Sequence, residues 1–266
     1  MKLTGERPMQ GATPDSLLAF HGAGYREIVA RLGSGVVVDV GCGVGDETTR
    51  LAAPDRMVVG IDYSAETMRI AGADHAGNPS VRFCAGDGSR LALRARSVDA
   101  IVSSHIIEHF TNPALHVAEL ARVLRPSGTA FVITPNAPAD FENPFHVYLF
   151  EPATLVSLLA LFFEDVACFG LEGDAALHAD FAARRASGER ILKLDVFGLR
   201  HRIPKRTYVW TYERALPLVY RVLGSGTTGI GSGLSEDNFF TTELINDSTP
   251  GLFAVASRPR LRDVSA

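Results

Sequence analysis

The stretch Val36-Val37-Val38-Asp39-Val40-Gly41-Cys42-Gly43-Val44-Gly45 decides the fold of this 266-residue chain. Its β-branched residues, followed by an acid and three alternating glycines, predict a buried strand that ends in a tight turn. Glycine lets the backbone turn sharply and lets a ligand approach it closely. The spacing G-x-G-x-G differs from the dinucleotide pattern G-x-G-x-x-G. A carboxylate two positions before the first glycine also suits a cationic amino group better than a pyrophosphate.

Two further acids follow apolar strands at the interval of one βα unit. Asp62 closes Met57–Ile61, and Asp87 follows Val81–Phe83 within the segment Cys84–Gly88. With these motifs the sequence resembles the class I S-adenosylmethionine-dependent methyltransferases, whose first motif is an acid followed by x-G-x-G-x-G. The resemblance implies that the cofactor is S-adenosylmethionine. An acid at the end of the second strand also occurs in nicotinamide-binding folds, so Asp62 alone does not discriminate between the two classes.

The resemblance also implies roles for individual residues. In the family, the acid after the second strand holds the ribose hydroxyls, and the acid after the third meets the adenine amino group. Asp39 is therefore expected to bind the methionine amino group through the turn, Asp62 the ribose, and Asp87 with Gly88 the adenine. The remaining residues expected at the cofactor are Gly41, Cys42, Gly43, Gly45, Tyr63, Ser103 and Ser104.

Apolar strands alternate with helical stripes along most of the chain, which predicts an α/β fold with a doubly wound, mostly parallel sheet. Ligands of such sheets bind at the carboxyl ends of the strands, where the glycine turn, Asp62, Asp87 and Ser103 all fall. The resemblance implies a seven-stranded, Rossmann-like sheet whose last strand is antiparallel. The expected strands cover residues 36–40, 57–61, 81–83, 98–103, 129–134, 163–169 and 251–256, and the clearest helices cover 15–32, 46–53 and 113–124.

Residues 172–240 hold more chain than a hairpin needs. Ten arginines and lysines face only three acids between residues 184 and 221. We interpret this insertion as a helical cap over the substrate pocket, whose charge would suit an anionic acceptor. A solvated helical face whose aromatic residues pack on the core explains it equally well. The predicted domains are an arm and helix (1–34), the cofactor-binding core (35–171), the cap (172–240) and the final strand and tail (241–266).

The candidate catalytic residues are histidines in two segments. In Ser103–Phe110, a helical turn would place His105, Glu108 and His109 on one face. This segment resembles the E-H signature of small-molecule and glycan methyltransferases, where these two residues often support the pocket. The loop after the fifth strand holds His146, the leading candidate for a base or an acceptor contact. A loop histidine can equally be a hydrogen-bonded structural residue.

A bound metal is a sharper hypothesis for the same histidines. His105, Glu108, His109 and His146 are chemically suitable ligands for zinc, or for a harder ion that keeps several waters. The arrangement resembles metal-assisted O-methyltransferases, which commonly have an acid where this chain has His105. The sequence therefore leaves the metal undecided.

Composition narrows the class of protein further. A net charge of −4 and a pI near 6.1 argue against a nucleic-acid-binding protein. Three cysteines in apolar contexts suit a reduced, cytoplasmic protein. The first ten residues lack the apolar core of a secretory signal, and the most apolar stretch, Leu155–Phe163, is too short to span a bilayer.

These observations predict a cytoplasmic methyltransferase that acts on a small molecule by in-line displacement. Oxygen is the expected acceptor atom, because histidines line the expected pocket. Two alternatives stay open, namely a glycan or lipid-linked acceptor, which the basic cap would suit, and a non-catalytic protein that binds S-adenosylmethionine. The sequence does not indicate the oligomeric state.

Overall fold

The computed structural model describes residues 13–140, 143, 145–192 and 231–260. For residues 187–192 it describes the backbone alone. These residues belong to two compact units, and each is described by itself. The core unit comprises Gly24–Ala139, Val147–Leu171 and Thr241–Ala266. The second unit comprises Met1–Ala23, Asp140–His146 and Glu172–Phe240. The domain limits predicted from the sequence stay a prediction.

The described strands form one mixed sheet in the order β3-β2-β1-β4-β5-β8-β6-β7. Strands β1 to β5 run parallel, and β8 lies antiparallel between β5 and β6. The strands are β1 Gly35–Val40, β2 Arg56–Asp62, β3 Val81–Ala85, β4 Val98–Ser104, β5 Leu124–Pro135, β6 Phe163–Gly173, β7 Phe239–Thr242 and β8 Gly251–Pro259.

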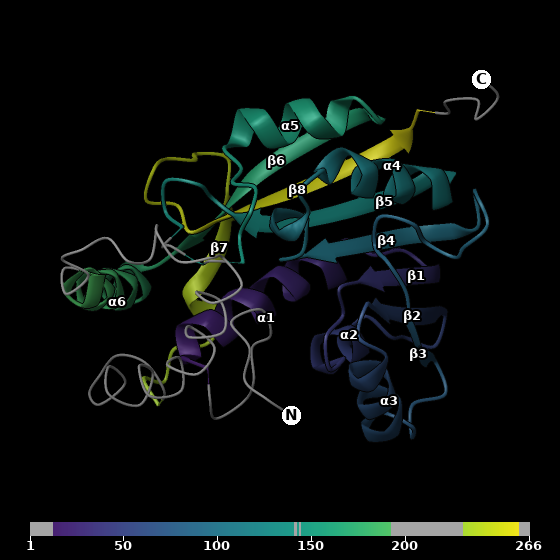
Figure 1. Ribbon diagram of the computed structural model, residues 1–266, viewed down its shortest axis with the longest axis horizontal. Helices are drawn as coiled ribbons and strands as arrows, with labels where there is room; N and C mark the ends of the chain where they lie inside the picture. Colours follow the sequence, from purple (N-terminus) through teal and green to yellow (C-terminus); the bar gives the residue numbers. More distant parts are fainter. Residues whose placement is uncertain (1–12, 141–142, 144, 193–230, 261–266) are drawn as a thin grey trace. The chain divides into compact units, whose positions relative to one another are not determined.

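The helices mostly follow strands, as in a doubly wound fold. They are α1 Asp15–Val29, α2 Asp46–Arg50, α3 Ala65–Asp74, α4 Pro113–Val123, α5 Pro152–Ala160 and α6 Ala175–Leu192, with short 3₁₀ turns η1 Ile107–His109 and η2 Glu236–Asn238. In the core unit, α4 and α5 cover one face of the sheet (Figure 1). The carboxyl-terminal part of α1 covers the other face, through Tyr25 and Ile28.

The alternation of β1 explains how the two cores form. Val38 and Val40 point to the face of α4 and α5, and Val37 points to the face of α1. Because successive side chains in a strand point to opposite faces, Asp39 shares the face of Val37. An acid is thereby buried beside α1, two positions before the first glycine of the turn.

Three details differ from the sequence-based expectation. The described sheet has eight strands where seven were predicted, because the aromatic and β-branched segment Phe239–Thr242 adds β7 at the edge beyond β6. Helix α2 ends at Arg50, and β5 begins at Leu124, earlier than expected, with an irregular register between Val98 and Ala100. The predicted cap lies largely outside the described residues, since only α6, η2 and the residues around them are described within 172–240.

Candidate functional site

The glycine turn that follows β1 has three residues in the left-handed region, with φ of 79° at Gly41, 54° at Gly43 and 87° at Gly45. A Cβ at Gly41 would lie 2.5 Å from Ile106, and one at Gly45 would collide with Phe83. Among the residues that the structure describes, a Cβ at Gly43 would meet nothing within 4 Å. The turn is therefore packed tightly at both ends and open in the middle, where a ligand can approach the backbone.

Asp62, at the end of β2, ties the turn to the next helix. Its Oδ2 accepts a hydrogen bond from the amide of Gly43 (3.3 Å), and its Oδ1 accepts one from the amide of Ser64 (2.9 Å). The side chain is 6% exposed, whereas that of the following Tyr63 is 69% exposed. The carboxylate predicted to bind ribose thus lies beside the open part of the turn.

Asp39 supports the turn from within the protein. Its carboxylate is fully buried and accepts hydrogen bonds from the Tyr25 hydroxyl (3.0 Å to each oxygen) and the Thr48 hydroxyl (2.6 Å). Burial raises the pKa of Asp39 to about 7, although both hydroxyls favour the ionised form. The structure shows Asp39 binding α1 and α2, and its predicted contact with the cofactor's amino group stays a prediction.

The side chain of Cys42 points away from the turn. It packs against Met68 and Ala71 of α3, with 3.7 Å between its Sγ and the Met68 sulfur. Burial raises the pKa of this thiol far above its ordinary value. Cys42 therefore belongs to the turn through its backbone, and its thiol acts as a small apolar group.

Asp87 and Gly88 form a turn after β3. The Asp87 side chain is exposed, and its Oδ1 accepts hydrogen bonds from the amide (2.8 Å) and hydroxyl (2.7 Å) of Ser89, which lower its pKa. Gly88 is buried, and a Cβ there would lie 3.0 Å from Val40 and 3.1 Å from Phe110. The predicted adenine-binding turn is thus packed against the end of β1.

A residue that the sequence analysis missed holds this turn. His116 of α4 is fully buried, with 2.7 Å between its Nδ1 and the carbonyl oxygen of Gly88 and 2.8 Å between its Nε2 and Ser103 Oγ. Burial lowers its pKa to about 4. The sequence feature that could have identified His116 was its spacing from Pro113 and Leu120, which places it on the buried face of α4.

The two serines at the end of β4 point to opposite faces of the sheet. Ser103 faces α4, where it pairs with His116. Ser104 is 6% exposed, and among the residues that the structure describes its Oγ has no hydrogen-bond partner. Both predicted residues therefore lie at the carboxyl edge of the sheet, and Ser104 has hydrogen-bonding capacity to offer a ligand.

The single helical face predicted for His105, Glu108 and His109 is not formed. His105 has φ of 53° and lies before η1, which contains Glu108 and His109. Its backbone amide donates to the carbonyl of Ile133 (2.9 Å) and thereby follows the end of the sheet instead of starting a helix. Its Nδ1 nevertheless comes within 3.7 Å of Glu108 Oε1.

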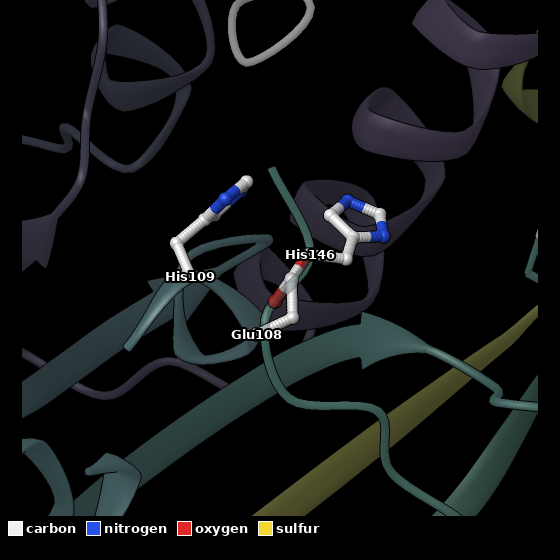
Figure 2. Close-up of side chains that lie close together, drawn as sticks. All are labelled: Glu108, His109 and His146. Carbon is white, nitrogen blue, oxygen red and sulfur yellow. The ribbon is translucent and has the colours of Figure 1, made fainter. Parts of the chain in front are cut away.

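Glu108 is a buried acid, 1% exposed, whose Oε2 accepts a hydrogen bond from the Thr134 hydroxyl (3.1 Å). Its backbone carbonyl accepts hydrogen bonds from the amides of Val147 (2.9 Å) and Tyr148 (3.0 Å). Glu108 thus joins η1 to the end of β5 and to the chain that follows His146. Figure 2 shows Glu108 and His109 on η1 and His146 on its own loop.

His146 lies in a short hydrogen-bonded loop of the second unit. Its Nδ1 is 2.7 Å from Asp140 Oδ2, and its Nε2 is 3.0 Å from the side-chain nitrogen of Asn143. The Asn143 oxygen is engaged by the amide of Phe145 (3.0 Å), so its NH₂ group must face His146. A carboxylate at Nδ1 and an N–H donor at Nε2 together favour the Nδ1–H tautomer, with the lone pair on Nε2.

Asp140 is the second residue that the sequence analysis missed. An acid six positions before a histidine in one loop was the available signal, but the intervening sequence has no regular period from which to infer contact. The proposed metal ligands come from both units, with His146 in the second and His105, Glu108 and His109 in the core. The metal site stays a prediction.

Comparison with known proteins finds the family described as methyltransferase domain over residues 38–132. A probable S-adenosylmethionine-dependent methyltransferase of Mycolicibacterium smegmatis is 34% identical over 166 residues, which are 60% of this chain and 63% of that protein. A trans-aconitate 2-methyltransferase of an Azoarcus species is 33% identical over 126 residues, which are 46% of this chain and 47% of that protein. The chain thus spans less than two thirds of the length of these curated relatives.

Among solved structures, a methyltransferase of Thermotoga maritima, described as a possible histamine N-methyltransferase, matches with a TM-score of 0.58. The match covers 91% of each chain at 14% sequence identity, so it speaks for the fold alone. It confirms the predicted Rossmann-like sheet with antiparallel strands at its carboxyl-terminal end. In the described part of the chain, none of the helices combines the length and apolar character needed to cross a membrane.

Proposed function

The chain belongs to the class I S-adenosylmethionine-dependent methyltransferases, and from this premise we propose that it methylates an oxygen atom of a small molecule. The observation that carries the proposal is the open glycine turn between Asp39 and Asp62. A ligand can lie against the backbone at Gly43, where a side chain would have no neighbour within 4 Å. The carboxylates of Asp39 and Asp62 flank the turn, which suits a cofactor with a cationic amino group and hydroxyl donors.

The residues around the turn would hold the cofactor in one orientation. Asp62 would accept hydrogen bonds from the ribose hydroxyls, and Asp87 with Gly88 would contact the adenine. Asp39 would hold the turn against which the amino group of the cofactor binds. When bound, S-adenosylmethionine supplies a methyl group that its sulfonium has already activated. What the protein adds is alignment, because an in-line displacement gains most from holding the nucleophile close to the methyl carbon.

His146 is the proposed base for the acceptor hydroxyl. Its Nδ1–H donates to Asp140, so the lone pair of Nε2 is available to take a proton once an acceptor hydroxyl replaces the Asn143 amide there. The Asp140 carboxylate stabilises the imidazolium that results, as an acid does beside a catalytic histidine. The acceptor oxygen would then attack the methyl carbon while the bond between that carbon and the sulfonium sulfur breaks, S-adenosylhomocysteine would leave as the neutral thioether, and the hydroxyl proton would end on Nε2 of His146. His105 and His109 stay candidates for contacts with the acceptor.

The cofactor site is tested by calorimetric titration of S-adenosylhomocysteine into the wild type and into Asp62→Ala. The substitution removes a carboxylate that would accept charge-assisted hydrogen bonds, so affinity is expected to fall about 10-fold or more. Asp62→Asn is the matched control, because its amide keeps one acceptor oxygen for the Ser64 amide. A folded wild type that does not bind would contradict the proposal.

The base is tested with labelled cofactor and a panel of trans-aconitate and small phenols as trial acceptors. His146→Ala is expected to lower methyl transfer to an accepted phenol by about 100-fold or more, the usual contribution of a general base, whereas transfer to an ionised carboxylate should be far less affected because no proton is removed. The affinity for S-adenosylhomocysteine should stay within about 2-fold of the wild type, because a base contacts the acceptor and not the bound cofactor. Transfer that continues at the wild-type rate would rule out His146 as the base.

A further inference from the structure

His116 connects three segments that the proposed cofactor site uses. Its ring bridges the carbonyl of Gly88 and the hydroxyl of Ser103, and Gly88 in turn packs against Val40 at the end of β1. In the sheet, β3 and β4 are separated by β2 and β1. One imidazole therefore ties the turn after β3 to the end of β4, across the strand that carries the glycine turn.

The chemistry of the two partners sets the tautomer of His116. A carbonyl oxygen only accepts hydrogen bonds, so Nδ1 must carry the proton that is donated to Gly88. Nε2 is then an acceptor, and the hydroxyl of Ser103 must donate to it. The hydroxyl of Ser103 is thereby fixed in one orientation toward the ring.

The surroundings leave this ring no alternative position. His116 and Ser103 are both 0% exposed, and the ring of Phe110 stacks on the imidazole with 4.5 Å between centroids. A Cβ at Gly88 would come within 3.4 Å of His116 Nδ1. Removing the imidazole would leave a buried carbonyl and a buried hydroxyl without their partner, which costs more than the hydrogen bonds contribute.

We propose that His116 is a positioning residue for the cofactor, which sets the spacing between the adenine side of the site at Asp87-Gly88 and the methionine side at Ser103. This inference rests on the proposed function, because it needs S-adenosylmethionine to lie across these strand ends. His116 does not itself contact the adenine side or the methionine side of the cofactor. It acts through Gly88 and Ser103.

The test is a graded series at position 116, measured by calorimetric binding of S-adenosylhomocysteine and of adenosine. His116→Leu removes both hydrogen bonds and is expected to weaken S-adenosylhomocysteine about 10-fold. His116→Asn offers an amide near the position of Nδ1 alone and should give an intermediate loss. His116→Gln offers one donor and one acceptor and should bind within about 3-fold of the wild type.

Val117→Ala is the matched control, because it leaves a cavity on the same buried face of α4 without removing a hydrogen bond. It should lower the melting temperature yet keep the affinity within about 2-fold. Adenosine reaches only one side of the site, so His116→Leu should weaken it less than it weakens S-adenosylhomocysteine. A merely structural role would weaken both ligands alike.

The outcomes separate the two proposals. A wild type that does not bind S-adenosylhomocysteine would overturn the proposed function. If the wild type binds but His116→Leu and His116→Asn match its affinity, the role of His116 is overturned. The same holds if Val117→Ala loses as much affinity as His116→Leu. If His116→Leu does not fold, the Asn and Gln variants still decide the matter.

Discussion

Asp39 and His116 are buried titratable groups whose pKa values move in opposite directions from the ordinary ones. Burial raises the pKa of Asp39 to about 7 and lowers that of His116 to about 4. In both cases burial disfavours the charged form. The acid is stabilised by two hydroxyl donors, and the histidine by one acceptor and one hydroxyl. Burial therefore shifts each group toward its neutral form, although the hydroxyls that contact Asp39 oppose the shift, and the titration of each group is linked to folding.

Stability should depend on pH through Asp39 with a definite sign. Its pKa is raised in the folded state, so the folded protein binds the proton more tightly and loses stability as pH rises from about 4 to about 7. Asp39→Asn removes this dependence. The unfolding free energy of the variant minus that of the wild type should therefore rise over this range, by on the order of 4 kcal/mol, and stay constant above it.

The measurement is urea unfolding at several pH values. Asp87→Asn is the control, because the pKa of Asp87 is lowered in the folded state. That acid contributes stability above its unfolded pKa and loses it as pH falls through its lower folded pKa, so the difference for Asp87→Asn should be flat between pH 4 and 7 and should change in the opposite direction only below about pH 4. A difference curve for Asp39→Asn that is flat between pH 4 and 7 would show that Asp39 is not held neutral.

At this scale, the sequence predicted the acids better than their partners. Asp39, Asp62 and Asp87 were selected because each follows an apolar segment, which is a local pattern, and their contacts with the cofactor stay a prediction. Asp140 and His116 were missed because their importance lies in a contact with another residue at hydrogen-bonding distance. No periodicity in the chain encodes that distance.

The glycine turn is the element whose local geometry matters most. Gly43 and Gly45 both have positive φ, yet their surroundings differ, because only Gly45 faces a neighbouring side chain, that of Phe83. An L-residue in the left-handed region is strained by about 1 to 2 kcal/mol. The two positions therefore separate the effect of strain from the effect of filled space.

Alanine at these two positions should give different results. Gly43→Ala is expected to lower the unfolding free energy by about 1 to 2 kcal/mol and to weaken S-adenosylhomocysteine about 10-fold or more, since its methyl group enters the space kept for the ligand. Gly45→Ala adds overpacking against Phe83 and should cost about 2 to 4 kcal/mol. Chemical unfolding and calorimetric binding measure the two effects.

Gly72→Ala serves as the control for both variants. Gly72 lies in α3, where a Cβ meets nothing within 4 Å, so alanine there should stabilise the protein by about 0.5 to 1 kcal/mol. It should leave binding unchanged. If Gly43→Ala binds as well as the wild type, the open middle of the turn does not receive the cofactor.

η1 is an element whose conformation was not predicted correctly from the sequence. The offsets among His105, Glu108 and His109 fit a helical face, but His105 has positive φ and its amide pairs with β5 instead. The tertiary hydrogen bond overrides the helical period over such a short segment. Long elements, such as α4, matched their prediction closely because their apolar period repeats over several turns.

On the scale of the whole molecule, the last strand completes the sheet. β8 lies between β5 and β6, so both of its edges are paired. Phe253 of this strand is fully buried, with its ring centroid 6.3 Å from that of Phe131 and 6.4 Å from that of Phe169. Strand β8 is thus part of the same core as β1, β2 and β3.

Phe253→Ala should therefore destabilise the whole sheet. Truncation of a fully buried phenylalanine typically costs about 3 to 5 kcal/mol, and the melting temperature should fall by roughly 10 °C. Thermal unfolding followed by circular dichroism measures the change. Leu161→Ala, at an exposed position of the same unit, should change stability by less than about 0.5 kcal/mol. Equal effects of the two substitutions would show that β8 is dispensable.

The sequence by itself determined the class of fold and the family, because strand alternation, glycine spacing and βα intervals are all local properties of the chain. Only the tertiary structure decided what surrounds those residues. The insertion of β8 and the addition of β7 depend on pairing between distant segments. The buried bridge made by His116 depends on distances of less than 3 Å between separate segments, and the contact of Asp140 with His146 depends on an irregular loop conformation that no local period encodes.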